Sequence, residues 1–91
     1  MKKLLFFHAT WCPPCRFCLK NVIEPLMTDY EEQIEVINAQ MEPASAEMMS
    51  VYRLPTFILL DKEKEVWRHV GSIGIDEMKR LLDGDTIHDY M

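Results

Sequence analysis

Short apolar runs alternate with amphipathic stretches along this sequence. The stretch from Lys3 to Ala9 is almost continuously apolar, which is typical of a strand buried on both faces. Apolar residues then recur at helical spacing on one stripe, opposite a charged face: Cys15, Cys18, Leu19, Val22 and Leu26 against Arg16, Lys20 and Glu24. Pro25 lacks a backbone donor and clashes with the preceding turn, so we expect it to kink or end this helix.

Later patterns predict three more strands and two more helices. The strands are short runs at Ile34 to Ile37, Phe57 to Leu60 and Val66 to Val70. A short helix opens at Pro43 and is marked by Ala44, Met48 and Val51. A closing amphipathic helix begins near Gly74 and is marked by Ile75, Met78, Leu81 and Leu82.

The order of these elements is β-α-β-α-β-β-α. A strand, a helix and a strand in succession imply a parallel pair with a right-handed crossover. The charged turn from Asp61 to Glu65 implies an antiparallel hairpin between the last two strands. We therefore expect an α/β fold in which a mixed four-stranded sheet is flanked by three helices.

Composition narrows the class of protein. Ninety-one residues, 48% of them hydrophobic, predict a single domain over 1–91, with 84–91 as a short, frayed acidic tail. The net charge of −5 disfavours binding to nucleic acid, which needs a concentrated basic face. No apolar run approaches a signal peptide or a membrane span. We therefore expect a cytoplasmic protein, in which cysteines stay reduced unless they perform redox work or bind metal.

The strongest candidate for chemistry is the segment Trp11-Cys12-Pro13-Pro14-Cys15, between a buried strand and a helix start. Two cysteines at this spacing can close a small disulfide ring, and the positive end of a helix stabilises a thiolate. Pro13 and Pro14 suit the first helical turn and fix the shape of the loop. Cys12, at the exposed tip, would attack a substrate disulfide, and Cys15, more sheltered, would resolve the mixed disulfide. A structural pair or half of a zinc site is the alternative, but the strand-to-helix placement favours redox work.

Three motifs in order resemble the thioredoxin-like superfamily. The stretch Phe7-His8-Ala9-Thr10-Trp11-Cys12-Pro13-Pro14-Cys15 resembles the active-site strand and loop, with Pro13 where glycine is usual. Leu54-Pro55-Thr56 resembles the cis-proline loop, and Val51 matches an apolar position before it. Val70-Gly71, followed by an amphipathic helix, resembles the closing segment of the fold. The resemblance covers most of the chain.

The resemblance implies a substrate-docking surface. Pro55 would be cis and lie opposite the cysteines, although a trans proline is the general expectation for such bonds. The backbone of Leu54 would pair with an extended substrate segment, as strand addition does elsewhere. Trp11, Leu54, Pro55 and the turn at Gly71 would then form a flat apolar patch. Trp11 could instead be only a core residue.

The sequence also departs from the family. It begins at the active-site strand, without the leading strand and helix of thioredoxins, which leaves a minimal, glutaredoxin-sized core. The glutathione-binding features of glutaredoxins are not evident, so a dithiol mechanism is favoured. Aligned on the motifs, Phe6 and Val36 occupy the positions of the buried aspartate and lysine of thioredoxins. We therefore expect Cys15 to lack a buried base and to be deprotonated through water or another group.

Four other side chains are candidates for metal binding or pH effects. Cys18 could join Cys12, Cys15 and His8 in a Cys₃His site, but its place on the apolar stripe favours a core residue. His8 could influence Cys12 electrostatically, or simply pack at the strand end. His69 and His88 have no partners at ligand spacing and are expected on the surface. We expect no metal and no cofactor beyond a redox-active Cys12–Cys15 disulfide.

These patterns together predict a small thiol–disulfide oxidoreductase that reduces protein disulfides. By family analogy its partners are protein disulfides and a reductant that resembles thioredoxin reductase or is linked to glutathione. The expected state is a monomer that binds neither nucleic acid nor membrane. The alternatives are a glutaredoxin-like electron donor and a non-catalytic module of the same fold that binds a partner or carries metal.

Overall fold

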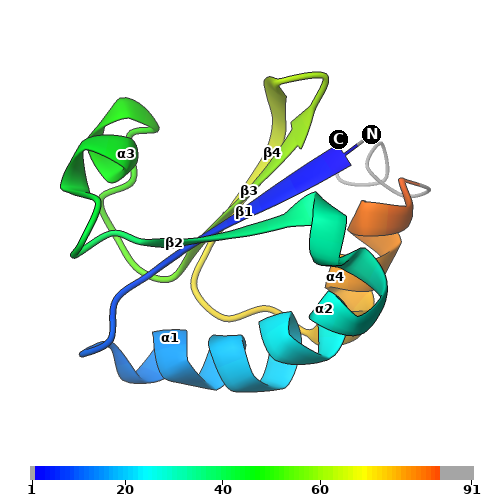
Figure 1. Ribbon diagram of the computed structural model, residues 1–91, viewed down its shortest axis with the longest axis horizontal. Coiled ribbons are helices and arrows are strands. Elements are labelled where there is room, and N and C mark those ends of the chain that lie inside the picture. The colour runs from blue at the N-terminus through cyan, green and yellow to red at the C-terminus, as the bar shows by residue number, and fades with distance from the viewer. Residues whose placement is uncertain (1, 85–91) are drawn as a thin grey trace.

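A mixed four-stranded sheet runs through the centre of the computed structural model, which describes residues 2–84 (Figure 1). Its strands, in the spatial order β2-β1-β3-β4, are β1 Lys2–His8, β2 Ile34–Asn38, β3 Thr56–Asp61 and β4 Lys64–Val70. Strands β1 and β2 are parallel, whereas β3 is antiparallel to both β1 and β4. The predicted α/β fold with a mixed four-stranded sheet is confirmed.

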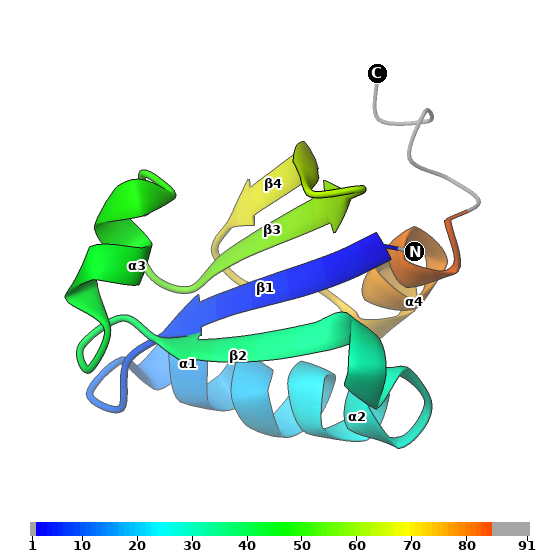
Figure 2. The same ribbon diagram turned by 45° about the horizontal axis from the view of Figure 1, so that its top comes forward.

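Helices cover both faces of this sheet (Figure 2). One face packs against α1 Pro13–Cys18, its continuation through α2 Glu24–Tyr30, and α4 Ile75–Asp83. The other face packs against α3 Pro43–Met48. The four side chains from Leu4 to Phe7 in β1 are all buried, because alternate side chains enter the two separate cores. The prediction of a strand buried on both faces is confirmed.

The first helix does not end at Pro25, so of the two outcomes that the sequence predicts there, a kink or an end, the end is wrong. A π-helical turn, η1 Leu19–Ile23, joins α1 to α2, and the N–H of Glu24 bonds to the carbonyl of Leu19, five residues earlier. Pro25 follows this turn directly, at the second position of α2, and π-helical turns of this kind occur as single turns inside α-helices. The chain therefore continues in helical form to Tyr30, followed by the short 3₁₀ segment η2 Glu31–Gln33.

Two other details differ from the predicted pattern. The hairpin turn is narrower than Asp61 to Glu65, because β3 extends through Asp61 and β4 begins at Lys64. Its two central residues, Lys62 and Glu63, both have positive φ (53° and 68°), as tight hairpins require. In α3 the buried residue is Ala46, whereas Met48 is 83% exposed. Met48, one of the apolar residues that marked this helix in the sequence, therefore does not pack against the sheet.

Some expectations concern features that the structure does not test. Most of the predicted acidic tail, at 85–91, and His88 within it lie outside the described residues. The single domain over 1–91 stays a prediction. Within residues 2–84, none of the helices combines the length and apolar character that crossing a membrane requires.

Candidate active site

The loop between β1 and α1 places Cys12 at the N-cap of α1, directly before its first helical residue. Cys12 has an extended backbone (φ −94°, ψ 109°), which suits both an N-cap residue and the residue before a proline. Pro13 and Pro14 fill the first helical positions, where a backbone donor is not needed. The N–H of Cys12 bonds to the Ala9 carbonyl at 3.3 Å, and the N–H of Arg16 bonds to the Cys12 carbonyl at 3.0 Å. These bonds fix the turn that carries the cysteine pair.

Cys12 lies deeper than the sequence predicts. We expected it at an exposed tip, but only 4% of the residue is exposed, so that expectation is wrong. Ala9, Cys15 and the partly buried Leu54 pack around it. Its sulfur accepts a hydrogen bond from the N–H of Cys15 at 3.3 Å, and the thiol lies 3.9 Å from the Leu54 carbonyl, to which it donates. A group that reacts at Cys12 must therefore approach over Leu54.

Cys15 is fully buried, one turn further along the helix. Burial raises the pKa of its thiol to about 12. A hydrogen bond to Cys12 acts in the same direction, because the protonated thiol is the donor, while the backbone of Ala9 partly opposes the rise. Cys15 is thus held as a neutral thiol next to the sulfur of Cys12, as a sheltered second cysteine would be.

The loop before β3 meets this pair from the other side. The Leu54–Pro55 peptide bond is cis, the isomer that the resemblance implies. The Pro55 carbonyl accepts the N–H of Gly71 at 2.9 Å, and Gly71 has a φ of 104°, which favours glycine. The structure therefore brings Leu54, Pro55 and Gly71 together, with Leu54 in contact with the Cys12 thiol. Their role in binding substrate stays a prediction.

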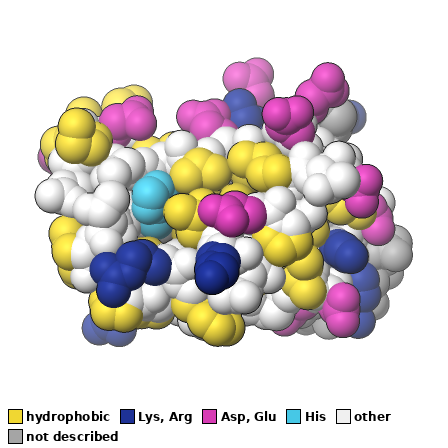
Figure 3. Space-filling view, turned by 60° about the horizontal axis from the view of Figure 1, so that its bottom comes forward, with side chains coloured by type: hydrophobic (Ala, Val, Ile, Leu, Met, Phe, Trp, Pro, Cys, Tyr) yellow, Lys and Arg dark blue, Asp and Glu magenta, His cyan; other side chains and the backbone are white. Residues whose placement is uncertain are grey.

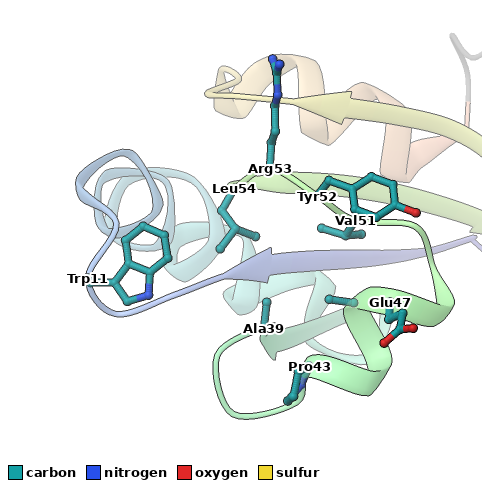
Figure 4. A pocket seen from close by; sticks show the side chains of 9 residues that line it. Trp11, Ala39, Pro43, Glu47, Val51, Tyr52, Arg53 and Leu54 are labelled. Atoms are coloured by element: carbon teal, nitrogen blue, oxygen red, sulfur yellow. The ribbon is translucent and has the colours of Figure 1, made fainter.

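A groove of about 870 Å³ opens beside the cysteine pair (Figure 4). We call it the active-site groove; its lining residues are Trp11, Ala39, Pro43, Ala46, Glu47, Val51, Tyr52, Arg53 and Leu54. Trp11 is 64% exposed at one end of the groove, so the alternative that it is a core residue is wrong. Tyr52, at the other end, is 84% exposed. Most of the other lining residues are apolar: Ala39, Pro43, Ala46, Val51 and Leu54.

Comparison with known proteins decides the family. The thioredoxin family model matches residues 1–84, which is most of the chain. The chain belongs to the thioredoxin family. A thioredoxin from Chlamydia caviae is 38% identical over 81 residues, covering 88% of this chain and 78% of the relative. A thioredoxin from Buchnera aphidicola is 29% identical over 82 residues, covering 88% and 75%.

Solved thioredoxin structures show the same fold. The thioredoxin of Fasciola hepatica superposes with a TM-score of 0.79 at 25% identity, covering 91% of this chain and 79% of its own. Thioredoxin 1 of Thermosipho africanus superposes with a TM-score of 0.76 at 26% identity, covering 98% of this chain and 99% of its own. The match to that second thioredoxin is therefore nearly end to end.

Membership of the thioredoxin family supports thiol–disulfide oxidoreductase activity in general, with disulfide-containing proteins and a reductase as partners.

The interior next to α1 is apolar at Phe6 and Val36, the two positions that the sequence singled out. Phe6 and Val36 are register partners on β1 and β2, and both contribute to the core that includes Cys18. Phe6 is fully buried and stacks on the ring of His8, with ring centroids 5.4 Å apart. Burial lowers the pKa of His8. The packing interpretation of His8 is confirmed, and no charged side chain occupies the positions of Phe6 and Val36.

Cys18 is fully buried in the larger core, so its interpretation as a core residue is confirmed. Among residues 2–84, no three His, Cys, Asp or Glu side chains are grouped so that they could hold a metal ion. The structure therefore does not assemble the Cys₃His set that the sequence left open. The expected absence of metal and cofactor stays a prediction.

Sequence reasoning missed several residues around the site. Arg16 donates to the Thr10 carbonyl at 2.9 Å and so braces the active-site loop. His69, expected on the surface, is half-buried, stacks on Trp67 and bonds to the Ser72 carbonyl at 2.9 Å. That bond holds the turn after Gly71. The position of Arg16 directly after Cys15 was a usable signal, whereas the contacts of His69 needed the register of β4.

Exposed apolar side chains also lie outside the groove. Phe17, on the outer side of α1, is 58% exposed. Seen from the side of α1 and α2, hydrophobic side chains are exposed among basic ones, while several acidic side chains stand along one edge (Figure 3).

Proposed function

We propose that this thioredoxin reduces protein disulfides through a Cys12–Cys15 dithiol. The observation that carries the proposal is the contact of Cys12 with both Cys15 and the cis-proline loop. Its sulfur receives the N–H of Cys15 at 3.3 Å and lies 3.9 Å from the Leu54 carbonyl. These two contacts support a role for the Cys12 sulfur as the nucleophile, with the substrate bound beside Leu54 and Cys15 as the resolving thiol.

The reaction has two exchanges. The thiolate of Cys12 attacks one sulfur of the substrate disulfide, forms a mixed disulfide, and the other substrate sulfur leaves and takes a proton. The Cys15 thiol then loses its proton and attacks the sulfur of Cys12. The Cys12–Cys15 disulfide forms, and the remaining substrate sulfur leaves and is protonated. The substrate gains two electrons and two protons, which a reductase or a glutathione-linked reductant must return to the protein.

Substrate docking would use the surface around the cysteines. The exposed ring of Trp11, the carbonyl of Leu54 and the Gly71 turn, which bonds to the carbonyl of the buried Pro55, offer an apolar platform with one backbone acceptor. An extended substrate segment can add to this loop as a strand would. Pro13 and Pro14 keep the cysteine loop in one shape during docking. Action as a monomer and in the cytoplasm are predictions of the same proposal.

Cysteine substitution tests the proposal. With a dithiol such as dithiothreitol as electron source, the protein should catalyse reduction of a disulfide-bonded polypeptide, and Cys12→Ser should abolish catalysis because the nucleophile is gone. Cys15→Ser should instead accumulate a mixed disulfide at Cys12, detectable by mass spectrometry. Cys18→Ala, which removes the third thiol from the core, is the matched control and should remain active.

Two results would reject the proposal. Wild-type protein that turns over no disulfide would point to a non-catalytic binding module instead. Catalysis that survives in Cys12→Ser would place the chemistry elsewhere. Replacing dithiothreitol with glutathione plus glutathione reductase, or with thioredoxin reductase, separates a glutaredoxin-like donor from a dithiol thioredoxin.

A further inference from the structure

Arg53 stands on the rim of the active-site groove with an unused guanidinium group. It directly precedes Leu54, whose carbonyl contacts the Cys12 thiol. Its own carbonyl accepts a hydrogen bond from the buried hydroxyl of Thr56, so the backbone of the rim is fixed. The side chain of Arg53 is exposed and forms no hydrogen bond or ion pair with any residue in 2–84.

Two other arginines near this region are engaged in the fold. Arg16 donates to the Thr10 carbonyl at 2.9 Å. Arg68 forms two bonds to Glu65 at 2.7 and 2.8 Å and two more to backbone carbonyls. The guanidinium groups of both arginines form hydrogen bonds within the fold, whereas that of Arg53 forms none within the described part of the chain. An arginine fork with five free donors is well suited to bind a carboxylate.

The arrangement of charges around the groove defines where a carboxylate could bind. Glu47 is the acidic side chain in the lining, and Arg53 is the basic one. Figure 4 shows Arg53 extending away from α3, while Glu47 lies on α3 across the groove. A carboxylate that contacts Arg53 is therefore kept apart from Glu47. The rest of the lining between them is mostly apolar.

We propose that Arg53 is a specificity-determining residue that selects disulfides flanked by an acidic residue. The inference rests on the proposed function. A substrate segment added along Leu54 places its cysteine near Cys12 and its neighbouring residue opposite Arg53, since successive strand residues are about 3.3 Å apart. Opposite cross-strand side chains lie about 5 Å apart at Cβ, within reach of an arginine–carboxylate pair.

The protein carries a net charge of −5, so a preference for acidic substrates opposes the electrostatic repulsion between the whole protein and such a substrate. At long range an acidic substrate is repelled, but salt at physiological strength screens charges beyond about 8 Å. The pair between Arg53 and a flanking carboxylate acts well inside that distance. The preference should therefore be local, and comparisons at one fixed salt concentration isolate it.

Paired peptides test this inference. Two disulfide-bonded peptides of identical sequence would carry either glutamate or lysine on both sides of the attacked cysteine, and kcat/KM is measured for each. Wild-type protein should prefer the acidic peptide by about threefold to fivefold, the effect of an exposed ion pair. Arg53→Gln should remove the preference, and Arg53→Glu should reverse it in favour of the lysine peptide.

Lys64→Gln is the matched control. It removes the same charge from an exposed residue of the β3–β4 hairpin, at the end of the sheet far from Arg53, and should keep the wild-type preference. Equal rates for both peptides in the wild type, or an unchanged preference in Arg53→Glu, would overturn the inference while leaving disulfide reduction intact. Failure to reduce either peptide would overturn the proposed function together with it.

Discussion

Cys15 is the residue whose chemistry depends most on its surroundings. Full burial is the first cause that raises the pKa of its thiol to about 12, and the hydrogen bond to Cys12 adds to it. Phe6 and Val36 are apolar register partners on β1 and β2 and belong to the core against which α1 packs. The proton of Cys15 must therefore leave by a route that the apolar interior does not supply.

The pH dependence of the second exchange follows from this burial. Because thiolate is the attacking species, the single-turnover rate of resolving a Cys12 mixed disulfide should rise about tenfold per pH unit between about pH 7 and pH 10. The raised pKa of Cys15 lies above this window, so no plateau is expected within it. Rapid acid quenching at a series of pH values measures the rate.

The same profile has a clear control and a clear contradiction. Cys18→Ala leaves Cys15 and its burial in place, so its profile should follow that of the wild type. A plateau near neutral pH would show that a base within the protein accepts the proton, and the hypothesis of an absent buried base would be wrong.

At the scale of elements, the long helix after Cys12 adjusts its pitch to accept a proline. The π-helical turn Leu19–Ile23 shifts the hydrogen-bond pattern by one residue before Pro25. Val22 within the turn and Leu26 after it both lie in the core with Cys18. The turn therefore keeps the apolar stripe continuous from the active site to the end of α2.

Proline substitutions should distinguish the two positions in α2. Pro25→Ala should change the free energy of unfolding by less than about 1 kcal/mol, because the π-helical turn before it already shifts the hydrogen-bond pattern around this position. Thr28→Pro, at an exposed position inside the same helix, should lower it by about 3 kcal/mol or more, since it removes a helical bond and clashes with the preceding turn. Urea unfolding followed by circular dichroism gives both values.

Similar losses in the two variants would contradict the role given to the π-helical turn. Thr28→Ala is the control for the side chain itself. Because Thr28 is exposed and alanine favours helix, this control should not lower stability.

At the scale of the molecule, Arg68 links the edge strand β4 to the segment that forms one wall of the groove. Its guanidinium bonds to the Met49 and Ser50 carbonyls at 2.7 and 3.0 Å, just before the groove residues Val51 and Tyr52. Glu65 holds the same group from β4, and the bond lowers the pKa of its carboxyl. One side chain thus fixes the end of α3 against the sheet.

Replacing Arg68 with lysine should loosen this connection although the charge is kept. An ammonium group cannot reproduce the planar fork, so Arg68→Lys should lower the free energy of unfolding by about 1–2 kcal/mol. In the wild type, the interaction of Glu65 with Arg68 contributes stability that is lost as the pH falls through the lowered pKa of Glu65. In Arg68→Lys this loss of stability in acid should be smaller. Urea unfolding at neutral and acidic pH measures both effects.

Lys64→Gln serves as the comparison, because it removes an exposed charge from the same strand and should change stability by less than about 0.5 kcal/mol. An Arg68→Lys protein as stable as the wild type would show that the four bonds contribute nothing measurable, and that Val51 and Tyr52 are positioned by packing alone.

Much of the fold was predictable because its local signals agree. The apolar run of β1, the helical stripe around Cys18 and the charged hairpin turn each predict one element, and the order of the elements limits the topology. The errors arose where one residue type is compatible with two different local structures. Pro25 can end a helix or open a new turn, and the pattern of apolar residues does not distinguish the two.

The candidate site divides in the same way. Cys12, Cys15 and Pro55 follow from motifs, because their chemistry needs particular residue types at fixed spacing. The burial of Cys12 and the groove between Trp11 and Tyr52 arise from segments about forty residues apart in the sequence, which no local pattern relates. Arg53 could not be singled out before its exposure, and its lack of partners among residues 2–84, were known.

The sequence by itself determined the thioredoxin fold, the cysteine pair and the loss of charge at Phe6 and Val36, since each depends on residue identity and order. Only the tertiary structure decided that Cys12 is buried too and how far the pKa of Cys15 is raised, because both depend on everything packed around the two thiols. It also decided where Arg53 stands relative to Cys12. Burial and proximity are properties of the folded chain, and they set which chemistry the same residues can perform.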